Sequence, residues 1–191
     1  ILRNIFPSPA TNRCKEKGGR SVTDLVKRSK KGDKEAFALL MDQHRQMLYN
    51  TALLTLHQED DALDAIQDTI LACWESLPTL QKDRYFKTWL VKILLNKCRD
   101  IQRKQSHYAF VEELPESGDE PDWDTSLDVG NAMKQLADKD QLILSLYYSD
   151  DLTVRQIADV LSISEGAVRV RLTRSRDRFK KLYLQEKGEC I

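Results

Sequence analysis

The sequence predicts an all-α protein in which two small helical domains are joined by an acidic, flexible linker. The chain has only 7 glycines and 5 prolines among 191 residues, which favours helices over a turn-rich β fold. Apolar residues recur at helical spacing on both sides of the middle of the chain. Between them, from Gln105 to Met133, acidic residues are frequent and Lys and Arg are absent. We therefore expect domains over 22–104 and 129–185 and a linker over 105–128.

Residues 1–21 show no helical period, and we expect them to be a disordered or non-native leader. Lys17-Gly18-Gly19 can be encoded by codons that contain a bacterial ribosome-binding sequence, and Val22 can be encoded by the start codon GTG. Our hypothesis is that translation begins at Val22. A genuine disordered arm or a remnant of cloning is the alternative, and the nucleotide sequence of the gene tests the hypothesis.

Within the first domain, Asp33 is expected to cap a helix. One face of this helix is apolar and should be buried; it carries Phe37, Leu40, Met41, His44 and Leu48. A histidine on such a face is more often packed or hydrogen-bonded than a metal ligand, so we interpret His44 as part of the core.

The next helix, expected over 60–77, is acidic on its outer side. Its carboxylates include Asp60, Asp61, Asp64 and Asp68. They can form a solvated face, a docking face for a basic partner, or the metal site of a nucleic-acid-processing enzyme. No nucleophile or further ligand converges on them in the sequence, and we therefore expect a protein that is not an enzyme.

A further helix over 82–105 has two different faces. Its apolar face carries Val91, Leu94, Leu95, Cys98 and Ile101. A second, polar and basic face carries Lys92, Asn96, Arg99 and Arg103. Such a stripe can follow a nucleic-acid backbone, and an asparagine can read the edge of a base. Phe86 and Trp89, at the start of the segment, are more typical of core packing than of base stacking.

The second domain contains a helix, a short turn and another helix, which predicts a helix-turn-helix domain. Thr153 can cap the first helix, and Ser164 can cap the second after the turn Ser162-Ile163-Ser164. The second helix has a core stripe of Val168, Leu172, Ser175, Phe179 and Leu182. Further helix over 132–148 should pack behind this motif.

Arginine is concentrated on the remaining faces of the second helix, although the formal net charge of the chain is zero. The basic residues there include Arg169, Arg171, Arg174, Arg176 and Arg178. A merely solvated basic helix is the simpler interpretation. The helix and turn just upstream favour a helix that lies in the major groove of DNA, where arginines meet bases and phosphates.

Other functions find little support in the sequence. The cysteines form no C-x-x-C pair and the histidines make no ligand spacing with them, so we expect no metal and no cofactor. No apolar run approaches the roughly 20 residues that span a bilayer, and the first residues do not resemble a secretory signal. We therefore expect a cytoplasmic protein that does not insert into membranes.

Taken together, these motifs resemble an extracytoplasmic-function (ECF) sigma factor, a bacterial RNA polymerase specificity subunit of the sigma-70 family. The resemblance covers about Thr23 to Tyr183. The segments that carry it, in order, are Lys31-Gly32-Asp33 with Ala36-Phe37, Asp64 to Thr69 with Trp74, Phe86 with Trp89-Leu90, Ile93 and Asn96, Gln156-Ile157-Ala158, and Ser164 to Arg176. Each motif is weak by itself, but the ordered set on both sides of an acidic linker is specific.

The resemblance implies a role for several residues. Asp64, Gln67 and Asp68 are expected to dock on the clamp helices of core RNA polymerase, with the polymerase flap as a further contact of the factor. Asn96 matches the position that holds a flipped-out minus-ten base. From the helical stripe, and not from the resemblance, we infer that Lys92, Arg99 and Arg103 support the adjacent strand or duplex. In the second domain, the positions that face the minus-thirty-five element are matched by Arg169, Val170, Thr173 and Arg174.

Arg171 and Arg176 are expected to contact phosphates or to pair within the helix. Two positions depart from the family pattern: Ala167 replaces a threonine before the recognition helix, and Leu63 replaces an acidic residue. These departures affect the expected contacts with the promoter and the polymerase. The family also implies that the linker passes through a basic channel of the polymerase, where Asp119 to Asp124 are our candidates, and that an anti-sigma factor, often membrane-bound, restrains the protein. The competing interpretation is a stand-alone helix-turn-helix regulator, which would bind duplex DNA without polymerase.

Overall fold

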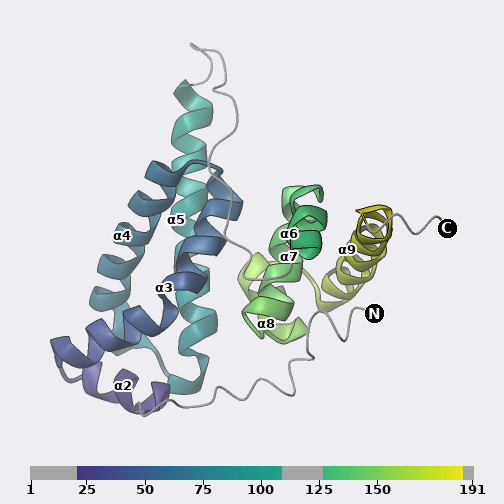
Figure 1. Ribbon diagram of the computed structural model, residues 1–191. Coiled ribbons are helices and arrows are strands. Elements are labelled where there is room, and N and C mark those ends of the chain that lie inside the picture. The colour runs from purple at the N-terminus through teal and green to yellow at the C-terminus, as the bar shows by residue number, and fades with distance from the viewer. Residues whose placement is uncertain (1–20, 109–126, 187–191) are drawn as a thin grey trace. The chain divides into compact units, whose positions relative to one another are not determined.

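The structure is a computed structural model that describes residues 21–108 and 127–186 (Figure 1). Within these ranges every regular element is a helix, which confirms the all-α prediction. The described residues divide into two compact units, the first built from α2 to α5 and the second from α6 to α9. The predicted leader, apart from Ser21, and most of the predicted linker lie outside the described residues.

The first unit is a helical bundle with a short helix across one end. Its helices are α2 (Val22–Ser29), α3 (Lys34–Leu56), α4 (Glu59–Ser76) and α5 (Phe86–Tyr108). Short 3₁₀ turns, η1 (Leu77–Thr79) and η2 (Asp83–Tyr85), connect α4 to α5. In Figure 1, α3, α4 and α5 lie side by side, and α2 crosses the end of the bundle where α5 begins.

Helix α5 continues past the predicted start of the linker. The sequence predicted that the linker would begin at residue 105, whereas the helix ends at Tyr108. The side chain of Gln105 donates a hydrogen bond of 2.5 Å to Asp61 Oδ2 on α4. The adjoining Gln, Arg and Lys residues are good helix formers, which helps to extend the helix.

The expected cap at the start of α3 is present. The carboxylate of Asp33 accepts a hydrogen bond of 3.0 Å from the backbone N–H of Ala36 and one of 2.8 Å from Arg28 Nε. These two partners, the backbone N–H of Ala36 first, hold the pKa of Asp33 below its usual value. Gly32, just before the cap, has a φ of 89°, which a residue without a Cβ adopts without strain. This turn sets the angle between α2 and α3.

The core of the first unit surrounds Phe86, which is fully buried. His44 lies against it with ring centroids 5.4 Å apart and donates a hydrogen bond of 2.8 Å from Nδ1 to the backbone oxygen of Leu40. Burial lowers the pKa of His44, so the histidine is neutral near pH 7. The core interpretations of His44 and Phe86 are both confirmed, while Trp89 is half-buried and packs against the edge of the core.

Alkaline pH should destabilise this unit through Cys73 and Cys98. Both thiols are buried, and burial raises the pKa of each to about 12. In the unfolded chain the thiols ionise near pH 8.5, so their contribution to stability is complete below that pH and is lost as the pH rises toward the folded pKa. Between pH 7 and pH 9.5 we expect the free energy of unfolding, measured with urea, to fall by about 1 kcal/mol for each thiol. In the double variant Cys73→Ala/Cys98→Ala this part of the pH dependence should disappear; an unchanged alkaline loss would contradict the assignment.

Over residues 127–186, the second unit has five helical segments packed around a core of its own. They are α6 (Leu127–Lys134), α7 (Asp138–Leu144), the π-helix η3 (Ser145–Ser149), α8 (Val154–Leu161) and α9 (Glu165–Glu186). Residues fully or nearly fully buried in it include Met133, Ile143, Leu146, Ile157, Val160, Val168, Leu172 and Phe179. The predicted helix over 132–148 is divided between α6, α7 and η3. The chain is extended at Ala137, and the side chain of Gln141 donates a hydrogen bond of 2.8 Å to the backbone oxygen of Leu136.

The helix-turn-helix caps are formed as the sequence predicts. Thr153 and Gln156 make a reciprocal capping box at the start of α8. Ser162 ends α8 in the left-handed conformation, with a φ of 57°, and Ser164 Oγ accepts a hydrogen bond of 3.1 Å from the backbone N–H of Ala167. On α9 the stripe is buried as expected except at its end, where Tyr183 is buried and Leu182 is half-buried.

Candidate nucleic-acid interface

One face of α9 is exposed and carries most of the predicted DNA-reading residues. Arg169, Val170, Thr173 and Arg174 are all exposed, and they lie opposite the buried Val168, Leu172 and Ser175. The hydroxyl of Thr173 donates to the backbone oxygen of Arg169 (3.0 Å), and Arg169 pairs with Glu165 at 3.1 Å. The ion pair is solvent-exposed and therefore weak, so DNA can replace it at low cost.

The other arginines of α9 differ in their surroundings. Arg171 is exposed, as expected of a phosphate contact. Arg176 is half-buried, and its guanidinium lies over the rings of Tyr147 and Tyr148, at 5.0 and 5.4 Å from their centroids. Arg178 pairs with the buried carboxylate of Asp140 on α7. The sequence analysis expected Arg176 to meet phosphates or to pair within the helix; the structure places it against another element of the same unit.

The polar and basic stripe on α5 is also assembled as predicted. Lys92, Asn96 and Arg103 are exposed and Arg99 is half-exposed. Arg99 Nη1 donates a hydrogen bond of 2.9 Å to Asn96 Oδ1. Because a guanidinium has only donors, this bond fixes the amide oxygen of Asn96 toward Arg99 and leaves its NH₂ group to donate elsewhere. Arg103 makes an exposed ion pair with Asp100 at 3.6 Å, which is readily exchanged for a phosphate.

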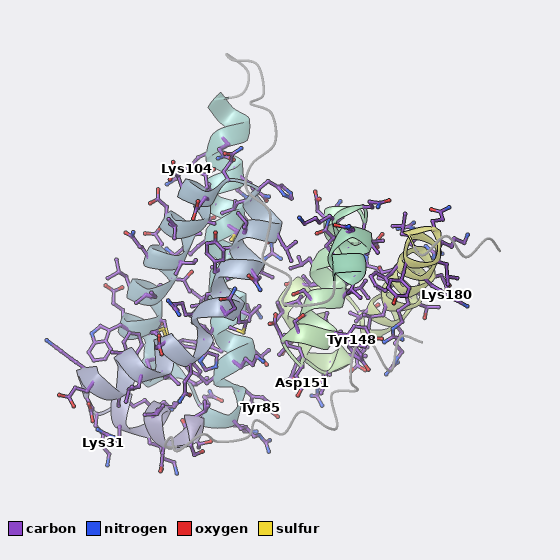
Figure 2. All side chains as sticks on the ribbon, viewed as in Figure 1. Lys31, Tyr85, Lys104, Tyr148, Asp151 and Lys180 are labelled. Atoms are coloured by element: carbon purple, nitrogen blue, oxygen red, sulfur yellow. The ribbon has the colours of Figure 1, made fainter. Side chains whose placement is uncertain are left out.

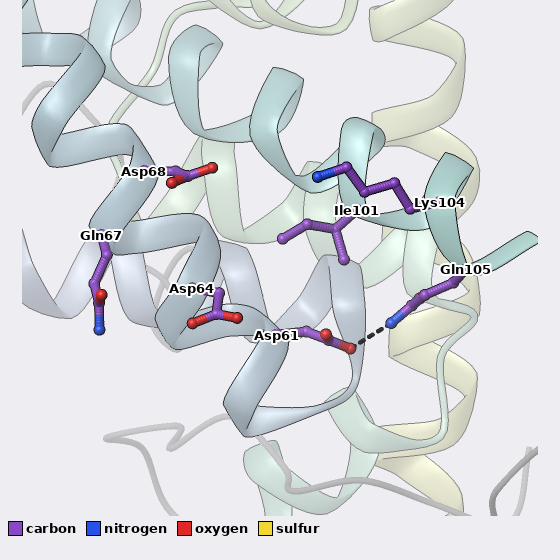
Figure 3. A pocket seen from close by; sticks show the side chains of 7 residues that line it. All are labelled: Asp61, Asp64, Gln67, Asp68, Ile101, Lys104 and Gln105. Carbon is purple, nitrogen blue, oxygen red and sulfur yellow. Dashed lines mark hydrogen bonds between the residues drawn. The ribbon is translucent and has the colours of Figure 1, made fainter. Parts of the chain in front are cut away.

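A third surface combines α4 with the end of α5 (Figure 3). Asp64, Gln67 and Asp68 are exposed on α4, and with Asp61 they line a hollow of about 430 Å³. Helix α5 supplies its opposite wall, from Ile101, Lys104 and Gln105, and Lys97 lies 3.9 Å from Asp68. The sequence analysis missed this contribution of α5, since the helical period of one segment does not show which segment packs beside it.

Exposed apolar side chains accompany the carboxylates on α4. Leu63 and Leu71 are 42% and 63% exposed, and both lie four residues from Gln67 along the helix. The sequence analysis did not name Leu71 as part of this surface. A face that mixes carboxylates with exposed leucines suits a protein partner better than a nucleic acid, whose phosphates the carboxylates would repel.

The described part of the chain was also compared with the requirements of a metal site and of a membrane-spanning helix. Among its His, Cys, Asp and Glu residues, no group of three or more is arranged to hold a metal ion. None of its helices combines the length and the apolar character that a membrane crossing needs.

The family comparison assigns both units. The family model described as Sigma-70 region 2 matches residues 40–108, which include the α4 face and the α5 stripe. The model described as Sigma-70, region 4 matches residues 132–181, which include α8 and most of α9. The chain belongs to the sigma-70 family. Region 2 precedes region 4 along the chain, as the sequence motifs predict.

Curated relatives place this sigma factor among the ECF type. The ECF RNA polymerase sigma factor SigW of Bacillus subtilis is 28% identical over 183 residues, which cover 84% of this chain and 95% of SigW. The ECF RNA polymerase sigma factor SigM of Mycobacterium tuberculosis is 28% identical over 166 residues, which cover 85% of each protein. This chain is thus an ECF sigma factor, an alternative sigma factor that serves transcription.

Solved structures agree with the fold. CnrH, solved in complex with the cytosolic domain of CnrY, has 26% identity and a TM-score of 0.60, with 84% of this chain and 95% of that chain covered. RpoE from Bartonella quintana, solved with the anti-sigma factor NepR, has a TM-score of 0.65 over 78% of this chain and 96% of that chain. Its identity of 21% supports a likeness of fold alone.

Proposed function

We propose that this sigma factor binds core RNA polymerase, directs it to specific promoters and initiates transcription with promoter melting. The observation that carries the proposal is that each of the two sigma-70 family matches contains an exposed basic surface. The α5 stripe lies in the region 2 match, and the arginine face of α9 lies in the region 4 match. The protein would act in the cytoplasm, as a binding factor and not as an enzyme, and would need no cofactor.

Each surface has its own proposed partner. The domain over 22–104 binds polymerase and the minus-ten element: Asp64, Gln67 and Asp68 contact the clamp helices, while Lys92, Asn96, Arg99 and Arg103 meet the melted strand. The domain over 129–185 lies near the polymerase flap and reads the minus-thirty-five element through Arg169, Val170, Thr173 and Arg174, with phosphate contacts from Arg171. The proposed role of Asp119 to Asp124 in a basic polymerase channel falls on residues outside those described.

A regulatory partner is a further part of the proposal. CnrH was solved with the cytosolic domain of CnrY, and RpoE with the anti-sigma factor NepR. We propose that an anti-sigma factor, either free or anchored in the membrane, likewise restrains this protein. Its binding would compete with polymerase for the α4 face, where carboxylates and exposed leucines are available.

Run-off transcription tests the proposed function directly. The purified protein is mixed with bacterial core polymerase and a library of genomic promoter fragments. Transcripts that depend on the added protein would establish sigma activity, and their start sites would reveal both promoter elements. An absence of transcripts together with tight duplex binding by the protein alone would overturn the proposal and favour a stand-alone helix-turn-helix regulator.

The substitution Asn96→Ala should slow open-complex formation and leave polymerase binding unchanged. The amide NH₂ of Asn96 faces away from Arg99 and can donate to an acceptor on an extruded base. Its loss should cost about 0.5–1.5 kcal/mol per hydrogen bond, or about 2- to 10-fold in open complexes measured by permanganate footprinting. Asn50→Ala on α3, where Asn50 accepts from Gln46, is the matched control. An equal loss of polymerase binding and melting would count against the base-holding role.

A further inference from the structure

Arg176 makes an unusual contact for a basic residue in a DNA-reading helix. Its guanidinium lies over two rings at once, and the rings of Tyr147 and Tyr148 are themselves in edge contact, with centroids 4.9 Å apart and planes at 81°. Its Nε is buried without a hydrogen-bond partner among the residues that the structure describes. A cation over the faces of aromatic rings is held by their quadrupole, and the attraction grows as the site is desolvated.

The two tyrosines belong to the π-helix η3, which is joined by its backbone to the start of the helix-turn-helix. The backbone N–H of Asp150 donates to Ser145 O (2.9 Å), and that of Leu152 donates to Leu146 O (3.0 Å). Leu152 is buried immediately before Thr153, the cap of α8. π-Helical turns are rare and are frequent at functional sites. The contact of Arg176 therefore connects α9, through η3, to the segment that positions α8.

A second contact joins the same stretch of α9 to α7. Ser175 is fully buried and donates a hydrogen bond of 2.6 Å to Asp140 Oδ1, and Arg178 pairs with Oδ2 of the same carboxylate. Arg176 is placed between these two residues. Three side chains of α9, all within the turn that follows the exposed Arg174, thus contact α7 and η3.

In a helix-turn-helix domain, the relative placement of the two helices decides whether base contacts and backbone contacts are made together. We infer that Arg176 is a positioning residue, whose contact with Tyr147 and Tyr148 sets the angle of α9 relative to α8 and so aligns Arg174 with the minus-thirty-five bases. This inference rests on the proposed reading of that element by α9. It predicts that Arg176 governs sequence discrimination and makes no phosphate contact of its own.

The test uses the full chain assembled with core polymerase, and promoter fragments with either the native or a scrambled minus-thirty-five element. Arg176→Met keeps much of the side-chain volume and removes the charge, and Arg176→Lys restores a cation. Tyr147→Leu/Tyr148→Leu removes the rings, and Tyr147→Phe/Tyr148→Phe keeps them. Arg171→Met is the matched control for a phosphate contact. Polymerase binding, thermal unfolding, and the salt dependence of promoter binding are measured for every variant.

We expect Arg176→Met and the Leu pair each to reduce discrimination between the two promoters by about 5- to 30-fold, without changing the salt dependence. Arg176→Lys and the Phe pair should retain most of the discrimination, and combining Arg176→Met with the Leu pair should add little. Arg171→Met should weaken binding to both promoters alike and lower the salt slope by about 1.

Two results would overturn the inference. If Arg176→Met behaves like Arg171→Met, Arg176 contacts a phosphate. If Arg176→Met lowers the melting temperature but the folded variant distinguishes the two promoters as well as the wild type does, the contact only stabilises the fold. A wild-type protein that binds polymerase but does not distinguish the two promoters would instead overturn the proposed function of α9, and this inference with it.

Discussion

The double substitution Asp64→Lys/Asp68→Lys should reduce binding to core RNA polymerase by about 100-fold or more. Both carboxylates are exposed on α4 beside Gln67, and their face also presents Leu63 and Leu71. If a basic surface of the polymerase docks there, charge reversal replaces attraction by repulsion at close range. Like charges brought together at an interface cost several kcal/mol, which corresponds to this loss of affinity.

The measurement is a titration of labelled polymerase with the sigma factor at two salt concentrations. Asp24→Lys/Asp42→Lys is the matched control, because it makes the same change in net charge at exposed positions on α2 and α3. The two double variants should differ most at low salt, where exposed charges are least screened. Equal losses in both would mean that net charge, and not the α4 face, governs binding.

Neutral replacements separate repulsion from lost attraction. Lys97 lies 3.9 Å from Asp68, so a lysine at position 68 also faces a like charge within the unit. Asp64→Asn/Asp68→Asn avoids this, and we expect it to cause a smaller loss with unchanged thermal stability. If Asp64→Asn/Asp68→Asn binds polymerase as tightly as the wild type, the two carboxylates contribute no attraction to the complex.

The local signals in the sequence predicted the starts of α3, α8 and α9 well, because capping acts between neighbouring residues; the helix predicted over 82–105 begins only at Phe86. Asp33, Thr153 and Ser164 each accept the backbone hydrogen bond expected of a cap. The exposed stripe on α5 and the arginine face of α9 follow from helical period alone. These features needed no knowledge of which helices pack together.

What the sequence could not show depends on contacts between distant segments. Arg176 looked like any other arginine of α9, and its place over Tyr147 depends on the π-helical turn of η3. The division of 132–148 depends on a side chain, Gln141, that bonds back to the backbone at Leu136. Lys104 completes the hollow beside Asp64 only because α5 packs along α4.

Arg174→Ala should weaken recognition of the minus-thirty-five element by about 1–3 kcal/mol if Arg174 reads a base. Arg174 is exposed on the same face as Val170 and Thr173, and no ion pair within the described residues holds it. A free guanidinium can bind the O6 and N7 atoms of a guanine as a fork, which fixes both the base and its position. The loss should therefore be confined to promoters that carry a guanine at one position of the element.

A set of promoters that vary one base at a time, assayed with the reconstituted holoenzyme, measures this loss. Lys180 is exposed further along α9 (Figure 2). It is six residues from Arg174 and so on another face of the helix, and Lys180→Ala should leave the base preference intact. A uniform weakening across all promoters, with the salt slope lowered by about 1, would make Arg174 a phosphate contact. The two outcomes differ because a base contact depends on the identity of one base pair, whereas a phosphate contact is the same for every sequence.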